Sequence, residues 1–266
     1  MENKVTRAGG VSFEVRGLSF AYERKPVLRG IDLKIPKGKI TTLIGPNGCG
    51  KSTLFQLLTK NLTPSRGSIF LEGTPLDALS LKEFARKVAI VHQNNTAPGD
   101  LTVEQLVAYG RIPYTKIGRS ASQPEDIRLI ERAMKITGIA PLRQRSIQTL
   151  SGGQRQRVWI AMALAQGTDT LLLDEPTTYL DVRYQIQILR LVRMLNRKYG
   201  ITIVMVLHDM NQTIQYSVEI VALSHKGVVV AQGAPNQVVS ADMLREVYGV
   251  QLEVAEYNGS KIVLNF

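Results

Sequence analysis

A glycine-rich stretch directly after an apolar run is the feature that most constrains this chain. Residues 45–53 read GPNGCGKST, and the run before them, residues 40–44, reads ITTLI. The spacing G-x-x-x-x-G-K-[ST] is typical of a phosphate-binding loop, whose glycines let backbone N–H groups approach a polyphosphate closely. We therefore expect a buried strand, a phosphate loop and a helix, in that order.

Individual loop residues have expected roles. Lys51 reaches the β- and γ-phosphates, the Ser52 hydroxyl ligates Mg²⁺, and the helix that starts at Lys51 adds the positive end of its dipole. A glycine-rich turn that binds nothing is the alternative, and the strand–loop–helix order disfavours it. The residues expected to contact nucleotide are Gly45, Pro46, Asn47, Gly48, Cys49, Gly50, Lys51, Ser52 and Thr53.

Composition sets only broad limits. The chain has 266 residues, of which 44% are hydrophobic and 21% charged, as in an ordinary globular protein. No apolar stretch approaches the length of a membrane span, and the first residues lack a signal-peptide core, so we expect a soluble, cytosolic chain unless a partner recruits it. The net charge of +11 is compatible with nucleic acid, anionic lipid or nucleotide as a binding partner, or with a surface that is basic for no specific role.

Cys49 is the single cysteine, which excludes an internal disulfide and fits a reducing compartment. It lies between the loop glycines, next to Lys51 and a helix N-terminus. A nearby cation and a helix N-terminus both favour a thiolate, so we expect the pKa of this thiol to fall and the thiol to be reactive. The alternative is that Cys49 is simply a small residue that fits the loop.

The order of the remaining elements indicates an α/β fold. Alternating apolar residues between 11 and 35 predict antiparallel strands with one buried face. Later strands alternate with helices, which indicates a parallel sheet. A short strand is expected at 68–71 and further strands at 88–92, 171–173 and 201–207. A largely helical stretch is expected at 94–165, a helix at 182–199 and a hairpin turn at Asn258-Gly259.

Capping boxes, in which a serine or threonine precedes a glutamate or glutamine by three residues, mark expected helix starts. They occur at Ser80–Glu83, Thr102–Gln105 and Ser122–Glu125.

Two further motifs accompany the phosphate loop. Asp174 and Glu175 follow the apolar run LLL, where Asp174 can hold Mg²⁺ at the carboxyl end of a strand and Glu175 could polarise an attacking water. The sequence Ser151-Gly152-Gly153-Gln154 starts an amphipathic helix and forms a second N-terminus suited to phosphate. Alone, the first motif could be a polar strand end and the second a flexible turn.

Together with Gln93, Asp181 and His208, these motifs resemble the complete set found in ABC-type ATPases, in the same order. The resemblance implies a single domain, 1–266, with an α/β P-loop NTPase (RecA-like) core and an antiparallel β portion in residues 1–93 and 166–266. It also implies a helical subdomain inserted at 94–165. The functional unit it implies is a head-to-tail homodimer, in which the Ser151–Gln154 signature of one subunit caps ATP bound to the loop of the other.

The same resemblance implies residue roles. Tyr22 would stack on adenine, although it could equally be a plain residue of a β-face. Gln93 would meet Mg²⁺ and the water, His208 would contact the γ-phosphate, and Asp181 would lie in a dimer-contact loop. The expected catalytic set is Lys51, Gln93, Glu175 and His208, and the expected metal ligands are Ser52, Gln93 and Asp174.

The segments TTYLD, VLHDMNQ and AQGAPNQVV resemble those of ATP-binding subunits of bacterial iron(III)-siderophore importers, with haem and cobalamin importers as close relatives. This implies integral membrane permease partners that dock at residues 101–113, an indirect partner in a substrate-binding protein, and a peripheral place on the cytoplasmic face of the membrane. An exporter subunit and a soluble ABC ATPase acting on nucleic acid are the alternatives. The short interval between Gln93 and Ser151 disfavours the latter, so no nucleic acid partner is expected.

Overall fold

The computed structural model describes residues 10–98, 100–114 and 123–264. The chain forms two compact units, one of residues 1–79 and 196–266 and the other of residues 80–195. The second unit contains the whole of the expected helical insert, 94–165, together with further residues at both ends. Each unit has its own buried core.

An antiparallel sheet opens the first unit. Its strands are ordered β2-β1-β4-β5. Buried residues of β1 face buried residues of β2, as in the pairs Phe13↔Ile35 and Val15↔Leu33, so the predicted one-sided burial is confirmed. The strands are β1 (Val11–Tyr22), β2 (Lys25–Pro36), β4 (Arg66–Leu71) and β5 (Thr74–Pro75).

Parallel strands form the second layer of this unit. β3 lies between β8 and β9 and is parallel to both, while β10 pairs with β9 in the antiparallel sense. All five residues of β3 are buried, including Thr41 and Thr42, so the strand shows no alternation of buried and exposed positions. The strands are β3 (Ile40–Ile44), β8 (Thr202–Val206), β9 (Glu219–Leu223) and β10 (Val229–Gly233).

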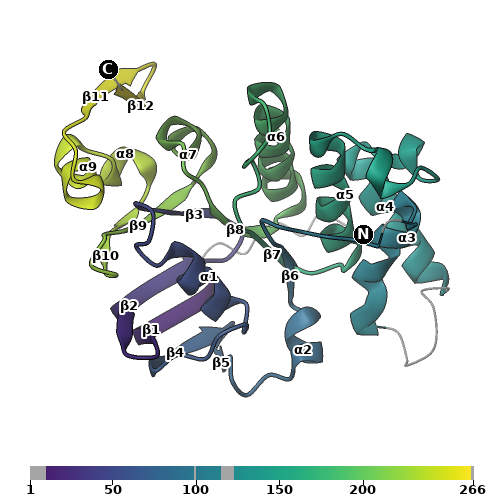
Figure 1. Cartoon of the computed structure of the whole chain (residues 1–266), viewed down its shortest axis with the longest axis horizontal. Helices are drawn as coiled ribbons and strands as arrows, with labels where there is room; N and C mark the ends of the chain where they lie inside the picture. The colour runs from purple at the N-terminus through teal and green to yellow at the C-terminus, as the bar shows by residue number, and fades with distance from the viewer. Residues whose placement is uncertain (1–9, 99, 115–122, 265–266) are drawn as a thin grey trace. The chain divides into compact units, whose positions relative to one another are not determined.

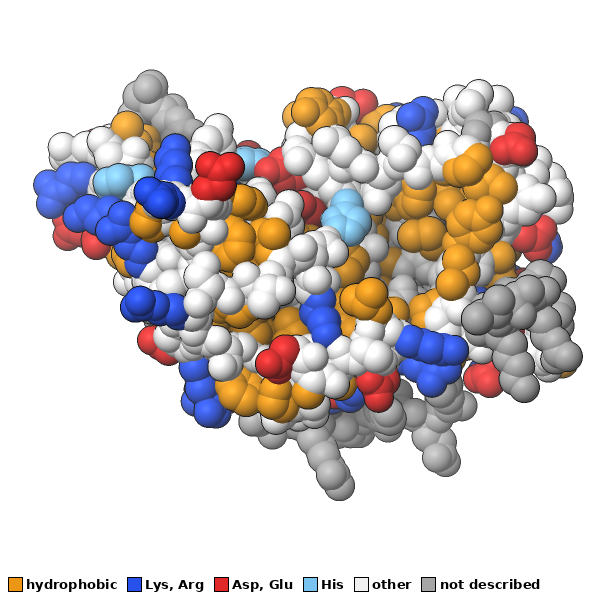
Figure 2. Space-filling view, turned by 60° about the horizontal axis from the view of Figure 1, so that its bottom comes forward, with side chains coloured by type: hydrophobic (Ala, Val, Ile, Leu, Met, Phe, Trp, Pro, Cys, Tyr) orange, Lys and Arg blue, Asp and Glu red, His pale blue; other side chains and the backbone are white. Residues whose placement is uncertain are grey.

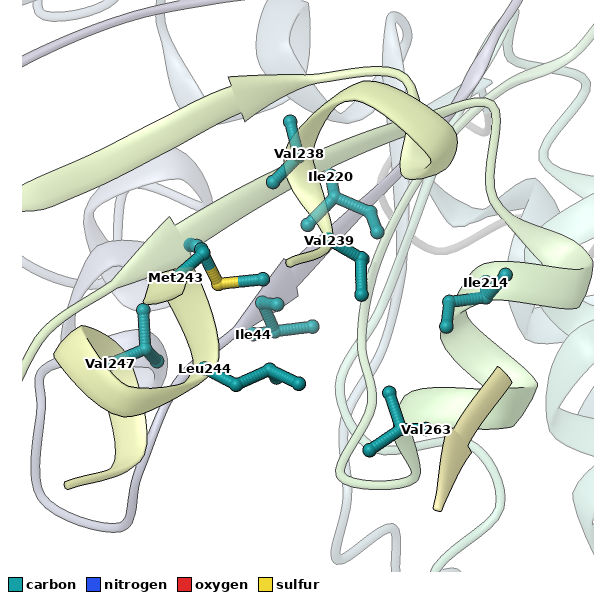
Figure 3. Close-up of a cluster of buried hydrophobic side chains, with 10 residues drawn as sticks. Ile44, Ile214, Ile220, Val238, Val239, Met243, Leu244, Val247 and Val263 are labelled. Atoms are coloured by element: carbon teal, nitrogen blue, oxygen red, sulfur yellow. The ribbon is translucent and has the colours of Figure 1, made fainter. Parts of the chain in front are cut away.

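The C-terminal elements pack on the end of β3. Ile44 belongs to a buried cluster with Leu244 and Val247 of α9, Val239 and Val263 (Figure 3). Because Ile44 directly precedes the glycine-rich loop, this cluster anchors the root of that loop. The elements after β8 are α7 (Met210–Tyr216), α8 (Pro235–Val238), α9 (Ala241–Tyr248), β11 (Glu253–Tyr257) and β12 (Ser260–Leu264).

Two local predictions are confirmed in the first unit. The glycine-rich loop joins β3 to α1 (Lys51–Leu58), giving the expected strand–loop–helix order. Asn258 and Gly259 have φ values of 50° and 73° and connect β11 to β12. Positive φ at both positions is what a tight two-residue hairpin turn requires.

The second unit combines two parallel strands with a group of helices. β6 and β7 are parallel, as the alternation of strands and helices predicted. α3 and α4 both pack on α5 (Figure 1). The elements are α2 (Leu81–Ala85), β6 (Val88–Val91), α3 (Val103–Ala108), α4 (Pro124–Thr137), α5 (Gly152–Ala165), β7 (Thr170–Leu173) and α6 (Val182–Tyr199). The last residues of α6, from Asn196 on, belong to the first unit. Short 3₁₀ helices lie at Tyr109–Tyr114, Ala140–Leu142 and Ile147–Thr149.

A buried ion pair crosses the helices of this unit. Arg111 Nε donates to Asp126 Oδ1 at 2.7 Å, and Arg111 Nη1 donates to the carbonyls of Ala165 and Gln166 at 3.0 Å each. Both charged side chains are less than a tenth exposed. The arginine therefore ties the 3₁₀ turn after α3 to α4 and to the end of α5, and nothing in the sequence pattern identified this contact.

Two of the three predicted capping boxes are confirmed. The hydroxyls of Ser80 and Thr102 each accept from the backbone N–H three residues further on. The side chains of Glu83 and Gln105 in turn accept from the backbone N–H of Ser80 and Thr102. The third started at Ser122, which lies outside the described residues. α4 itself begins at Pro124, where proline fits the first turn because its missing N–H has no helical partner there.

Candidate nucleotide-binding site

The glycine-rich loop adopts a backbone that requires glycine at defined positions. Gly45, Gly48 and Gly50 have φ values of 148°, 77° and 103°. A Cβ on Gly45 would lie 2.4 Å from the carbonyl oxygen of Leu223, and one on Gly50 would lie 2.6 Å from Cδ2 of Leu28. Around Gly48 no heavy atom lies within 4 Å of such a Cβ. Two glycines are therefore fixed by packing, and the third leaves an open stretch of backbone that a ligand can approach.

Lys51 is held in the loop by uncharged groups. Its side chain is 5% exposed, and its Nζ donates to the carbonyl oxygens of Gly45 at 2.7 Å and Pro46 at 2.9 Å. Carbonyls carry no formal charge, so these contacts do not neutralise the ammonium group. A phosphate bound inside the loop would supply that charge. The geometry around Lys51 therefore fits a polyphosphate ligand.

The start of α1 provides further groups for an anion. Gly50 caps the helix with a left-handed backbone and no side chain, which leaves the first backbone N–H groups of α1 without a side-chain acceptor. Ser52 is exposed in this first turn, where its hydroxyl is accessible. An exposed hydroxyl beside a phosphate site is a suitable Mg²⁺ ligand, so Ser52 fits the role predicted for it.

The prediction for Cys49 is wrong. Its side chain is 1% exposed, and burial raises the pKa of the thiol, with the Lys51 ammonium group opposing this only in part. Desolvation of the thiolate outweighs the attraction of the cation, whose Nζ lies 4.0 Å from Sγ. Cys49 is thus a small apolar group that fills space under the loop, and its Sγ would lie 2.7 Å from a Cβ on Gly45.

The acidic motif and the glutamine lie together in the second unit. Asp174 and Glu175 follow β7, and Gln93 follows β6, its parallel neighbour, so all three belong to the same edge of this strand pair. Gln93 Nε2 donates to Glu175 Oε2 at 2.7 Å, and Thr178 Oγ1 donates to the same oxygen at 2.9 Å. Glu175 also has a φ of 47°, an unusual backbone for a residue other than glycine. Two donors therefore fix the direction of a carboxylate at the carboxyl end of a strand.

Ser151 starts α5 with a complete capping box. Its hydroxyl accepts from the backbone N–H of Gln154, and Gln154 Oε1 accepts from the backbone N–H of Ser151 at 3.1 Å. Ser151 and Gly152 are exposed, whereas Gly153 is buried. The resulting turn presents a serine side chain at the N-terminus of a 14-residue helix, an arrangement suited to an anion.

The other predicted site residues lie at the ends of elements. His208 is exposed and lies between β8 and α7. Asp181 is exposed, and its Oδ1 accepts from the backbone N–H of Tyr184 at 3.1 Å. Tyr22 ends β1 with 47% of its surface exposed, its ring stands edge-on to Phe20, and its hydroxyl donates to Gln56 Oε1 at 3.4 Å. Exposure leaves all three accessible to a ligand or partner.

The two units carry different parts of the predicted site. The first carries Tyr22, the glycine-rich loop and His208. The second carries the acidic motif with Gln93, the Ser151–Gln154 turn and Asp181. Their roles toward a nucleotide therefore stay predictions.

Sequence reasoning missed two side chains beside these residues. The hydroxyl of Thr178 donates to the carboxylate of Glu175. Its place three residues after Glu175 was a signal in the sequence from which this contact could be predicted. Tyr248 donates to Met210 Sδ at 3.5 Å, in a hollow of about 200 Å³ that His208 also lines. Burial raises the pKa of Tyr248 to about 12, opposed in part by the backbone of Gly45, so the phenol stays neutral. No sequence pattern links Tyr248 to Gly45.

A glycine-rich phosphate loop between a buried parallel strand and a helix defines an α/β protein of the P-loop NTPase class. The family model described as ABC transporter matches residues 28–178, more than half of the chain. The chain belongs to the ABC transporter family, binds ATP and is an ATPase.

Curated relatives are similar over nearly their whole length. The ferric enterobactin transport ATP-binding protein FepC of Escherichia coli strain K12 is 44% identical to this chain, in an alignment that covers 90% of this chain and 88% of FepC. The iron(3+)-hydroxamate import ATP-binding protein FhuC of Bacillus subtilis strain 168 is 45% identical over 91% of this chain and 90% of its own.

A solved structure supports the same fold. CbiO1 of Clostridium perfringens, part of the ABC transporter complex cbiONQ, has a TM-score of 0.76 at 30% identity and covers 89% of this chain and 93% of its own. In the described part of the present chain, no helix combines the length and apolar character needed to cross a membrane.

Proposed function

We propose that this chain is the ATP-hydrolysing subunit of an importer that takes up iron–siderophore complexes across the cytoplasmic membrane. The glycine-rich loop with its buried, carbonyl-held Lys51 supports ATP binding most directly. The identities of 44% and 45% to proteins named for ferric enterobactin transport and iron(3+)-hydroxamate import support the substrate class.

The proposed chemistry is attack of water on the γ-phosphate. Lys51 and the N-terminus of α1 bind the phosphates, and Lys51 stabilises the charge of the transferred group. Glu175, held in place by Gln93 and Thr178, orients the attacking water and accepts its proton as general base, while ADP leaves. His208 donates a hydrogen bond to the γ-phosphate. Mg²⁺, for which Ser52, Gln93 and Asp174 supply suitable oxygen atoms, would neutralise phosphate charge when bound.

The proposed active form is a homodimer. The Ser151–Gln154 turn is exposed at its first two residues, so a partner's nucleotide can reach the serine hydroxyl and the start of α5. A two-fold axis repeats this contact, giving two nucleotides per dimer. Asp181, exposed on the loop before α6, would contact the partner, and Tyr22 would stack on adenine. Hydrolysis then reopens the dimer.

As an ATPase of this family, the chain works with membrane permease components. We place their docking site at residues 101–113. This is supported by exposed Tyr109 and Ile112 and by a hollow of about 350 Å³ beside α3 and α4. Its lining is mixed, with Ala108, Ile127 and Ile130 beside Thr102, Glu104, Gln105 and Gln144. Figure 2 shows hydrophobic side chains gathered over the helices of this unit. The subunit would lie on the cytoplasmic face of the membrane and receive cargo indirectly from a substrate-binding protein. No nucleic acid partner is proposed.

Import of haem or cobalamin is the second candidate. It is favoured by similarity to the hemin import ATP-binding protein HmuV of Enterobacter cloacae, which is 36% identical over 96% of this chain. The two candidates share the ATP site and differ only in cargo.

Transport in proteoliposomes would separate these candidates. The subunit is reconstituted with its permease and substrate-binding protein, and uptake of a ferric hydroxamate, ferric enterobactin, haem and cobalamin is compared at saturating ATP. ATP-dependent uptake of one ferric siderophore, abolished by Lys51→Ala, is expected. Uptake of haem or cobalamin alone would contradict the siderophore assignment.

A further inference from the structure

The starts of α5 and α6 are in direct contact within the second unit. A Cβ on Gly153 would lie 2.5 Å from Cδ1 and 2.7 Å from Cγ of Tyr184. Next to it, a Cβ on Gly152 would lie 3.4 Å from Cδ2 of Leu180. The tyrosine ring therefore occupies the space that any side chain at position 153 would need, and only glycine fits there.

The contact continues along both helices. One turn further on, Arg157 Nη2 donates to Gln187 Oε1 at 2.7 Å. Leu180, Tyr184 and Gln187 are spaced four and three residues apart, so they form one stripe along α6 and the residues leading into it. This stripe packs against the first turns of α5 and fixes the position of the Ser151–Gln154 turn.

The same stripe is joined to the loop that carries Glu175. Thr178 donates to the carboxylate of Glu175, and the backbone N–H of Leu180 donates to the carbonyl of Thr177 at 3.3 Å. Asp181 then caps the backbone N–H of Tyr184 at 3.1 Å. Short hydrogen-bonded steps thus connect Glu175 to the backbone of Tyr184, whose ring packs against Gly153.

We propose that Tyr184 is a positioning residue for ATP hydrolysis, whose ring holds the Ser151–Gln154 turn in a fixed relation to the Glu175 loop of the same chain. This inference rests on the proposed homodimer, in which the turn and the Glu175 loop of one chain serve two different nucleotides. A movement of the loop around one nucleotide would then shift the turn that seals the other. Tyr184 itself touches neither nucleotide.

Steady-state ATPase measurements on the reconstituted transporter test this proposal. Tyr184→Phe keeps the ring and should retain kcat within about twofold of the unsubstituted protein. Tyr184→Ala should lower kcat at least about tenfold, because a small misplacement of a positioning group is costly. The Kd of the isolated subunit for a fluorescent ATP analogue should stay unchanged, because the glycine-rich loop lies in the other unit. Tyr257→Ala, an exposed tyrosine on β11, is the control and should be unaffected.

A rescue experiment tests the steric contact itself. Gly153→Ala should lower kcat strongly, since the new methyl group meets the ring. Removing the ring in Gly153→Ala/Tyr184→Ala should raise kcat at least about fivefold above that of Gly153→Ala alone, a non-additive result expected only for residues in contact. Should Tyr184→Ala fail to fold, Tyr184→Ser, which also removes the ring carbons Cγ and Cδ1, takes its place in both experiments.

The failure of this inference can be told apart from the failure of the proposed dimer. Glu175→Gln is expected to accumulate an ATP-bound dimer, and adding Tyr184→Ala should reduce that accumulation. If Glu175→Gln forms no dimer, the proposed function is contradicted. If Glu175→Gln does form the dimer, but Tyr184→Ala alters neither the dimer nor kcat, the inference is overturned. It is also overturned if the kcat of Gly153→Ala/Tyr184→Ala is as low as two independent defects predict.

Discussion

The side-chain amide of Gln93 donates a 2.7 Å hydrogen bond to the carboxylate of Glu175, joining the ends of the parallel strands β6 and β7. Thr178 donates to the same carboxylate oxygen. A carboxylate that is fixed by two donors at a strand end is pre-oriented for a task, since its direction does not have to be set when substrate arrives.

Replacing Glu175 by glutamine tests whether its carboxylate acts on the attacking water. We expect Glu175→Gln to lower kcat by about two to three orders of magnitude, because a positioned general base contributes about this much. ATP affinity should be retained, since the glycine-rich loop is unchanged. Phosphate release and equilibrium binding of an ATP analogue provide the measurements. Glu253→Gln, an exposed glutamate on β11, is the control. A fully active Glu175→Gln variant would refute the role.

Lys51 should determine nucleotide affinity. Lys51→Ala removes a charge-assisted contact to phosphate worth about 1.5–3 kcal/mol, so ATP affinity should fall by at least about tenfold. The fold should persist, because Lys51 donates to two backbone carbonyls and to Cys49 Sγ and forms no ion pair with any residue that the structure describes. Isothermal titration with ATP measures the loss, with the exposed Lys226→Ala as control. Normal affinity in Lys51→Ala would exclude this role.

Cys49 should be unreactive in the folded protein. Because burial raises the pKa of its thiol, the thiolate fraction at a given pH is lower than for a free cysteine. Labelling with a maleimide should therefore be slow near neutral pH, rise only as the pH approaches the raised pKa, and become fast in denaturant. Mass spectrometry of labelled protein across this pH range gives the rates. Rapid labelling of the native chain at neutral pH would contradict the burial of Cys49.

The raised pKa also has a consequence for stability. Because the folded protein favours the neutral thiol, the thiol of Cys49 stabilises the folded state relative to the unfolded state at low pH. This stabilisation is fully present below the pKa of the unfolded cysteine and is lost as the pH rises through the pKa of the folded protein. The free energy of unfolding, measured with Cys49→Ala as reference, should show this difference only on the alkaline side. A difference that appeared on the acid side would contradict the sign.

The buried pair Arg111–Asp126 should be important for stability. Asp126→Ala leaves the Arg111 cation without its carboxylate, and breaking a buried pair in this way costs about 3–5 kcal/mol. Denaturant unfolding measures this cost. Glu125→Ala breaks the exposed pair with Arg128 and should cost less than about 1 kcal/mol. Equal effects of the two variants would show that the buried pair does not hold the helices together.

Features set by local sequence were predictable, and those set by distant contacts were not. The order β3, loop, α1 and the Asn258-Gly259 turn follow from glycine positions and apolar runs, and both were correct. The thiol of Cys49 was assigned the wrong pKa shift because the sequence shows its charged neighbour but not its burial. The contacts Arg111–Asp126 and Gly153–Tyr184 join segments that packing alone brings together, so no local pattern indicates them.

In the proposed homodimer, the Ser151 turn of one subunit seals ATP on the glycine-rich loop of the other. Crosslinking of two populations tests this contact in the Cys49→Ala, Glu175→Gln background, with Asn47→Cys in one population and Ser151→Cys in the other. Asn47 and Ser151 are both exposed. We predict ATP-dependent crosslinked dimers only when the two populations are mixed. An absence of crosslinks in the mixture at saturating ATP would contradict it.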